Sequence, residues 1–312
     1  MKTIANQIII LLLLLNISFY SQNDSKSCCK KDFSVNEDED HSCCYKTTDL
    51  SDEDEIDLFD RKSKPTISIS YGAPNVDSKY FKSINSIKPV NIELKLGTLK
   101  QKDYYNSEDI IKSSFNYFLI NNYSTYLIRD NNSVSNLKVD IWRFGFGVQS
   151  GFGYKINESF AIIPFTENSV TWSHVDFAYD STIISNFEND YLKLFDKSFR
   201  FGISSEGGLK FRLINNLCFD FSFERHIIFQ RVLFWKLSGS HLIEFASQSL
   251  LDNFIDRIFK SSPNAAPIVS FVLKNALSYG FNQLRTERMN WPFISASPLF
   301  IDQFKIGVNF IF

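Results

Sequence analysis

Four of the five cysteines form two vicinal pairs near the N-terminus, and their surroundings allow two kinds of chemistry. The pairs are Cys28-Cys29 and Cys43-Cys44, with His41 beside the second. In an oxidising compartment they can bond to each other and close a loop of about 15 residues. Alternatively, the four thiolates with His41 and nearby carboxylates can bind a soft or borderline metal such as zinc or copper. Because CC…CC is not a zinc-finger spacing, we favour disulfides and keep metal binding as the alternative.

Two groupings of serine, histidine and acid could in principle support hydrolysis. They are Ser173, His174 and Asp176, and Ser222, Glu224 and His226. The second grouping shares one parity of an alternating segment, so its members can lie close together. Neither contains a recognisable nucleophile motif, and we interpret them as interior hydrogen-bonding groups. We therefore expect no enzyme activity and no cofactor.

Strict alternation of apolar and polar residues predicts long β-strands. In the clearest segment Trp142, Phe144, Phe146, Val148, Phe152, Tyr154 and Ile156 alternate with Arg143, Gly145, Gly147, Gln149, Gly151, Gly153 and Lys155. A strand places these two sets on opposite faces. The segment also runs well past the length of about 5–6 residues that is usual for soluble strands.

The composition of the two faces favours a membrane barrel over a soluble sandwich. The apolar face is densely aromatic, as a lipid-facing wall is, while the other face mixes glycine with charges of both signs, as a narrow lumen requires. The charges on this polar parity are Glu93, Lys95, Arg143, Arg200, Glu206, Lys210, Arg212, Asp220 and Glu224. A small barrel fills its interior with side chains. We expect these charges to form a paired network that closes the lumen, whereas a selective pore is more often lined by one sign.

Eight segments carry the strand pattern. They are residues 66–72, 89–100, 115–129, 137–156, 159–175, 198–214, 217–237 and 300–312. An even number of about eight is the smallest common size of a membrane barrel. The predicted fold is all-β, an antiparallel transmembrane β-barrel of about eight strands with an inserted α-helical hairpin before the last strand.

The N-terminal part of the chain predicts export. Residues 1–21 have the layout of a cleaved signal peptide, with an apolar run too short to span a bilayer as a helix. Residues 22–64 are acidic and cysteine-containing with almost no apolar periodicity, and we expect a disordered periplasmic tail. The barrel then occupies residues 65–312.

The chain ends in an alternating strand whose last residue is aromatic. Its apolar positions are Phe304, Ile306, Val308, Phe310 and Phe312. This strand resembles the C-terminal targeting strand of small bacterial outer-membrane β-barrel proteins of the OmpA/OmpX-like class. The resemblance implies a location in the outer membrane of a Gram-negative-type cell, contact with outer-membrane lipid, and recognition by the barrel-assembly machinery.

The long connection before the last strand has helical rather than loop character. Apolar residues recur at helical spacing on both sides of a break at residues 261–267, so we expect a helical hairpin over about 241–286. Its two apolar stripes must be covered by other groups. The two helices can pack on each other as a cap over the barrel, enter the lumen as a plug, or bind a protein partner or lipid.

From these features we expect a non-catalytic membrane barrel with a structural or interaction role, in which the hairpin serves as a cap or as a partner-binding element. The alternatives are a small-solute pore or transporter, a metal-linked envelope protein that uses the cysteine tail, and an outer-membrane lipid hydrolase. We expect no nucleic-acid partner.

Overall fold

The computed structural model describes residues 63–81, 87–104, 107–127, 137–179 and 185–312. Residues 1–62, which include the expected signal peptide, all but the last two residues of the acidic tail and its four cysteines, lie outside the described residues.

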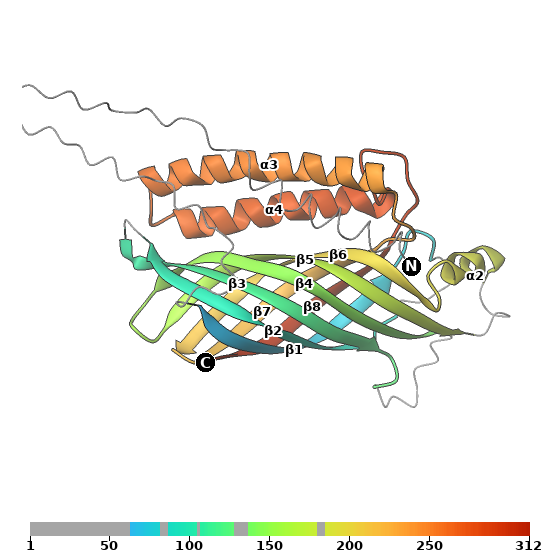
Figure 1. Cartoon of the computed structure of the whole chain (residues 1–312), viewed down its shortest axis with the longest axis horizontal. Coiled ribbons are helices and arrows are strands. Elements are labelled where there is room, and N and C mark those ends of the chain that lie inside the picture. The colour runs from blue at the N-terminus through green and yellow to red at the C-terminus, as the bar shows by residue number, and fades with distance from the viewer. Residues whose placement is uncertain (1–62, 82–86, 105–106, 128–136, 180–184) are drawn as a thin grey trace, which may run out of the picture. The chain divides into compact units, whose positions relative to one another are not determined.

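Eight antiparallel strands close into a barrel in the order β1 to β8 (Figure 1). They are β1 (Lys64–Asp77), β2 (Val90–Tyr104), β3 (Ser107–Ser124), β4 (Leu137–Lys155), β5 (Ala161–Tyr179), β6 (Ser198–Ile214), β7 (Leu217–Ile228) and β8 (Leu299–Ile311). The last strand pairs with both β7 and β1, so no edge of the sheet is left open. The predicted fold class is confirmed.

The strands have two ends of different character. At the turn end, short connections join β2 to β3, β4 to β5 and β6 to β7, and β1 begins where β8 stops. The side chain of Asn157 forms one of these turns by accepting from the backbone N–H groups of Ser159 and Phe160. At the opposite loop end, long connections join the other strands.

β1, β2 and β5 extend four or five residues past their predicted ends, and two other strands, β3 and β7, differ most from their predicted limits. β3 begins eight residues before the predicted position and ends five before it, because bulky residues such as Ile111 and Phe115 face the lumen here while Lys112 and Ser114 face outward. This reverses the usual alternation. β7 ends at Ile228 rather than at Leu237, where a helix has already begun.

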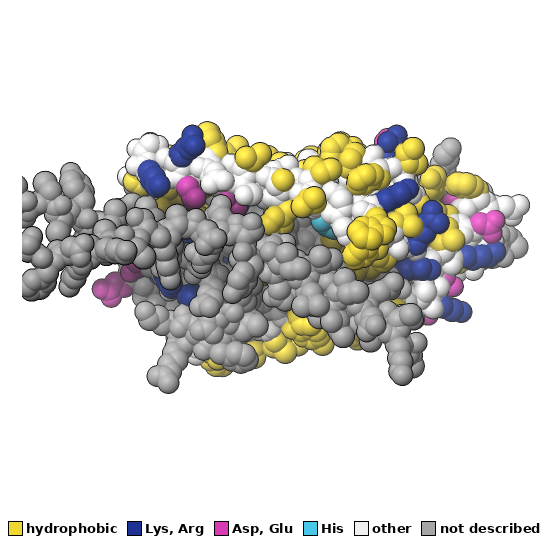
Figure 2. Space-filling model, turned by 45° about the horizontal axis from the view of Figure 1, so that its top comes forward, with side chains coloured by type: hydrophobic (Ala, Val, Ile, Leu, Met, Phe, Trp, Pro, Cys, Tyr) yellow, Lys and Arg dark blue, Asp and Glu magenta, His cyan; other side chains and the backbone are white. Residues whose placement is uncertain are grey.

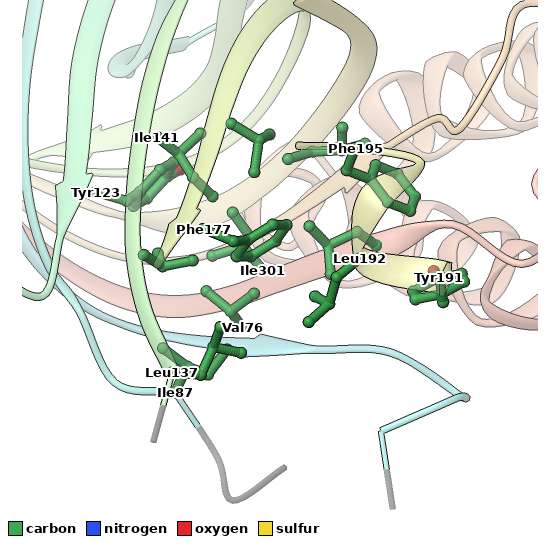
Figure 3. Packing of buried hydrophobic residues seen from close by; sticks show 14 residues of the cluster. Val76, Ile87, Tyr123, Leu137, Ile141, Phe177, Tyr191, Leu192, Phe195 and Ile301 are labelled. Atoms are coloured by element: carbon green, nitrogen blue, oxygen red, sulfur yellow. The ribbon is translucent and has the colours of Figure 1, made fainter. Parts of the chain in front are cut away.

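A short helix, α2 (Asn186–Lys193), was not predicted and caps the loop end of the barrel. It starts at Ser185, whose hydroxyl accepts from the Glu188 N–H. Its Tyr191 and Leu192 are buried against lumen-facing residues of several strands (Figure 3). The Tyr191 hydroxyl donates to the Pro298 carbonyl at 3.0 Å. The helix thereby ties the β5–β6 connection to the segment that leads into β8.

The predicted helical hairpin is present as α3 (Phe234–Ser261) and α4 (Ala266–Glu287). It lies neither over the mouth nor inside the lumen, but against the outer wall of the barrel beside β4, β5 and β6 (Figure 1). The placement as a cap is therefore wrong. None of the helices in the described part of the chain combines the length and apolar composition of a membrane-spanning helix.

Candidate functional site

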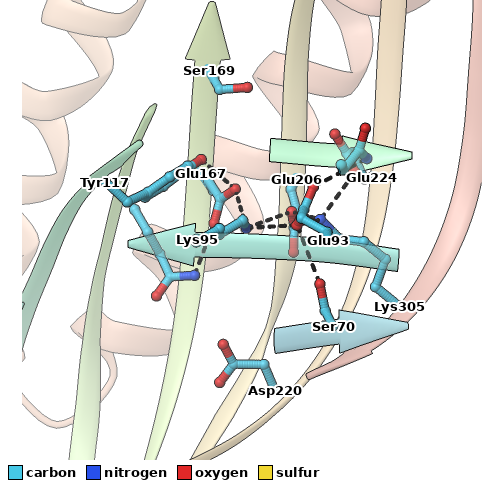
Figure 4. A network of polar contacts seen from close by, with 12 residues as sticks. Ser70, Glu93, Lys95, Tyr117, Glu167, Ser169, Glu206, Asp220, Glu224 and Lys305 are labelled. Carbon is cyan, nitrogen blue, oxygen red and sulfur yellow. Dashed lines mark hydrogen bonds and ion pairs between the residues drawn. The ribbon is translucent and has the colours of Figure 1, made fainter. Parts of the chain in front are cut away.

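The centre of the lumen holds a buried network of ion pairs contributed by strands all around the barrel (Figure 4). Arg143 of β4 bridges Glu93 of β2 at 2.6 Å and Glu224 of β7 at 2.5 Å. Its Nε also donates to the Asn121 side chain at 3.1 Å. The Arg143 side chain is completely inaccessible, so both carboxylates meet its charge without competing water.

Two lysines extend this network across the interior. Lys305 of β8 lies 2.5 Å from a carboxylate oxygen of Glu206, 2.8 Å from Glu93 and 3.0 Å from Glu224. Lys95 lies 2.5 Å from Glu167 and 3.3 Å from Glu206. Each lysine therefore contacts carboxylates on strands that are not its neighbours in the sheet, so the contacts hold opposite walls of the barrel together.

Toward the turn end, the neutral side chains of Gln149 and Tyr117 connect the network to a further ion pair, Lys210–Asp220. Gln149 donates to Glu167 at 2.9 Å and accepts from Lys210. Lys210 also pairs with Asp220 at 3.7 Å, and the Tyr117 hydroxyl donates to Glu167. We call the charged members together the lumen network: Glu93, Lys95, Arg143, Glu167, Glu206, Lys210, Asp220, Glu224 and Lys305.

Apolar side chains close the lumen on both sides of this network. Toward the loop end lies the largest buried cluster, in which Val139, Phe177 and Ile301 pack with residues of α2 (Figure 3). Toward the turn end, Leu99 and Phe115 pack in a second cluster that includes the free thiol of Cys218. A polar layer with apolar layers above and below is the arrangement of a filled interior.

Seven of the nine charges predicted for the lumen belong to the lumen network. The other two, Arg200 and Arg212, have the same parity but lie near the two ends of β6. Arg200 donates to the backbone carbonyls of Gln230 and Leu194 at the loop end. Arg212 donates to Gln101 and to the Glu158 carbonyl at the turn end. The parity of a position predicts the face of the strand on which its side chain lies. It does not predict how far along the barrel axis that side chain lies from the centre of the lumen.

The sequence reading missed Glu167 and Lys305 as members of the network. Glu167 lies on β5, whose outward positions include Pro164, Thr166 and Asn168, so the alternation that would have marked its face is weak. Lys305 follows Phe304 in the alternating C-terminal segment, which the sequence analysis uses only as a targeting strand. The alternation of β8 was the signal that could have found it.

The histidine groupings do not assemble a hydrolytic site. Ser173 is buried in the lumen, whereas its neighbour His174 lies on the outer face and contacts the Phe199 ring. His226 is buried in the lumen, and its Nε2 lies 2.9 Å from the Thr171 hydroxyl. Glu224 is engaged by Arg143, as described above. The interpretation of these residues as interior hydrogen-bonding groups fits this geometry.

The outer face of the barrel is apolar where the inner face is polar. Phe146, Trp142 and Ile92 have half or more of their surface exposed, while the residues beside them in sequence are buried in the lumen. The same holds for the last strand, where Phe304 is 72% exposed and its neighbour Lys305 is buried. A soluble protein would present the opposite arrangement, because exposed aromatic walls of this extent need an apolar environment.

The fold is similar to that of small outer-membrane barrels. Neisserial surface protein A matches over 80% of this chain and 97% of its own, with 9% identity and a TM-score of 0.37. The attachment invasion locus protein Ail of Yersinia pestis matches over 80% and 99%, with 10% identity and a TM-score of 0.29. OprG of Pseudomonas aeruginosa matches over 80% and 97%, with 10% identity and a TM-score of 0.28. No protein-family model and no curated protein matches the sequence.

Proposed function

We propose that this protein is an outer-membrane β-barrel with a closed lumen, which acts through its surfaces rather than by catalysis or conduction. The observation that carries the proposal is the lumen network, buried between two apolar clusters inside a closed barrel with an aromatic outer wall. Moving an ion through this interior would require breaking buried ion pairs that have no water to replace them, which costs several kcal/mol for each pair.

The lumen network also argues against the alternative of a small-solute pore. A pore needs a continuous lining, usually of one sign, along which an ion or solute can bind weakly and leave. Here cations and carboxylates from opposite walls contact one another at 2.5–3.3 Å and occupy the cross-section. One feature favours the pore, a cavity of about 330 Å³ at the turn end beside Gln101, Lys155 and Arg212. It adjoins the apolar cluster of Leu99 and Phe115.

The location is tested by fractionation. The full chain, expressed with its N-terminal segment in a Gram-negative host, is expected in the outer-membrane fraction, and its migration on gels should change when the sample is heated. The physical reason is the aromatic wall, which is stable only against lipid or detergent. Recovery as a soluble periplasmic monomer would contradict the proposal.

The closed lumen is tested in planar bilayers. Insertion of the folded protein is expected to leave the membrane conductance at its baseline. The double variant Arg143→Ala with Lys305→Ala provides the comparison: it removes the two side chains that bridge the walls, but the apolar clusters on both sides of the network remain, so its conductance should also stay at the baseline. Large, stable steps from the unmodified protein would favour the pore instead.

A further inference from the structure

The α3–α4 hairpin runs the full height of the barrel on its outer face. At the loop end, Leu237 of α3 is buried with Ile227 and Phe229, which lie at and just beyond the end of β7. At the turn end, the Phe259 ring lies 4.4 Å from that of Phe152 and 4.8 Å from that of Tyr104. A helix of 28 residues is about 42 Å long, which exceeds the hydrocarbon core of about 30 Å. The hairpin therefore accompanies the strands through the whole depth that the barrel would occupy in a bilayer.

The buried positions of the hairpin hold polar and small residues beside the large apolar Leu237, Ile255, Phe259 and Phe281. Within α4, the buried residues include Ser270, Ser278, Asn282 and Arg285. The Arg285 guanidinium pairs with Glu244 of α3 at 2.7 Å, which satisfies both charges between the two helices. A hairpin that covered a barrel in water would leave charged and polar residues on its exposed side, with few large apolar ones.

The wall beneath the hairpin is polar as well. Thr166 points outward from β5, is buried, and accepts a hydrogen bond from Asn275 of α4 at 3.0 Å. Farther toward the loop end, Arg225 of β7 makes two hydrogen bonds of 2.7 Å with Asp302 of β8 and contacts Gln283 and the ring of Tyr279 on α4. These outward polar groups would face lipid if the hairpin were absent.

The exposed side of the hairpin is apolar along its middle. Its exposed large apolar residues are Trp235, Leu242, Ile243, Phe245, Leu250, Phe254, Ile268, Val272, Tyr279 and Leu284. The exposed charged residues of α3 lie toward its two ends, Lys236 in the first turn and Asp252, Asp256, Arg257 and Lys260 in the last third. The intervening exposed positions span about 22 Å at 1.5 Å per residue, close to the apolar band of about 25 Å on membrane barrels. Figure 2 shows the same distribution, with hydrophobic side chains along the hairpin and basic ones toward its ends.

From these observations we propose that the α3–α4 hairpin is embedded in the bilayer together with the barrel, with lipid acyl chains covering its apolar side. The hairpin is thus part of the lipid-facing wall, and it covers a polar stripe on strands β5 to β8. Neither helix is apolar enough to cross a membrane by itself, because only one side of the hairpin meets lipid while the other meets the barrel. This inference rests on the proposed membrane location of the barrel. Lipid is the occupant because the exposed side is continuous with the aromatic wall and because α3 has no exposed charged residue between Lys236 and Asp252, a length close to that of the apolar band. On α4, Lys274 is 30% exposed and pairs with Asp252 at 2.8 Å, at the edge of this length.

The test measures the collision of spin labels with oxygen, which concentrates in lipid, and with a water-soluble nickel complex. Single cysteines replace Leu242, Leu250 or Val272 in the full chain, with the five native cysteines changed to serine, after folding into lipid vesicles. Phe146→Cys on the barrel wall is the lipid reference, and Lys193→Cys on α2 is the water reference. We expect the oxygen-to-nickel ratio at the three hairpin sites to shift to that of the Phe146 site.

The reference sites separate the two proposals. A lipid signal at the Phe146 site with a water signal on the hairpin would overturn the embedded hairpin and leave the barrel proposal intact. A water signal at the Phe146 site would overturn both. Shielding of the hairpin sites from both reagents would overturn lipid as the occupant and indicate a protein partner or a second copy of the chain.

A second measurement tests the docking without spin labels. Thr166→Cys combined with Asn275→Cys, in the same cysteine-free chain, should form a disulfide on mild oxidation because these side chains are in contact. Thr166→Cys with Leu284→Cys is the matched control, since Leu284 is nine residues from Asn275, on the opposite side of α4, and is 43% exposed. Equal yields from the two pairs, or none from the first, would show that α4 does not lie on the wall and would overturn the inference.

Discussion

Arg143 is the residue at which the interior of the barrel is most tightly connected. Its guanidinium reaches two carboxylates on β2 and β7 and lies 5.2 Å above the ring of Tyr123. Buried ion pairs add little stability relative to apolar packing, yet removing one partner leaves the other charge buried without compensation. The cost of a substitution at this position therefore comes from the carboxylates that remain.

Replacement of Arg143 by methionine is expected to lower the free energy of unfolding by about 3–5 kcal/mol, because Glu93 and Glu224 lose a buried partner. Urea unfolding of the protein in detergent, followed by heat-modifiable migration, measures the change. Lys193→Met is the control, since the Lys193–Asp190 pair is exposed and should contribute less than about 1 kcal/mol. Equal effects of the two substitutions would show that the lumen network does not stabilise the barrel.

Glycines 207 and 280 differ in what a side chain would meet. A Cβ at Gly207, on the outer face of β6, would lie 2.0 Å from the Asn275 side chain, whereas a Cβ at Gly280 in α4 meets nothing within 4 Å. Gly207→Val should therefore destabilise the folded state by about 1–3 kcal/mol through overpacking. Gly280→Ala should stabilise it by about 0.5–1 kcal/mol, because alanine favours the helix. Unfolding midpoints measure both, and a neutral Gly207→Val would show that the Asn275 side chain can move aside without cost.

At the scale of elements, the last strand closes the barrel and carries the predicted targeting pattern. Within the finished barrel its backbone closes the sheet, and the Phe312 N–H donates to the Pro65 carbonyl at 2.9 Å. The Phe312 side chain itself is 68% exposed and packs little. Its resemblance to a targeting signal concerns assembly, which precedes the folded state.

Phe312→Asp is accordingly expected to impair assembly in cells and to leave the chain open to periplasmic proteases. The same variant, refolded into detergent without any assembly machinery, should unfold within about 0.5 kcal/mol of the unmodified protein, as surface substitutions usually do. Pulse-chase proteolysis and urea unfolding give the two readings. Normal assembly of the variant in cells would remove the support for a targeting strand.

The elements also show what the sequence could and could not predict. β4 and β6 were placed correctly because each of their faces is chemically uniform. β3 was misplaced because apolar residues fill the lumen near the turn end and reverse its alternation. For the hairpin, helical spacing of apolar residues revealed an apolar side. Periodicity does not distinguish an apolar side that meets protein from one that meets lipid, so the placement on the outer wall needed the contacts of Asn275 and Arg225.

At the scale of the whole molecule, the barrel is closed by residues 64–311 alone. A chain that lacks residues 23–62 but keeps residues 1–22 is expected to reach the outer membrane and to show the same unfolding midpoint, because every hydrogen-bonded strand pair remains. Gel migration and urea unfolding check this. A large loss of stability would show that the N-terminal segment takes part in the fold.

The ion pair between Arg225 and Asp302 joins the two strands that flank the hairpin in the sequence. An arginine facing the acyl chains costs up to about 2–4 kcal/mol, depending on depth. The α3–α4 hairpin, which covers this pair, lies between Arg225 and Asp302 in the sequence. It is therefore connected to both strands when β7 and β8 pair. Because the hairpin is the connection between β7 and β8, the pairing of these two strands brings together the two charges and the segment that covers them.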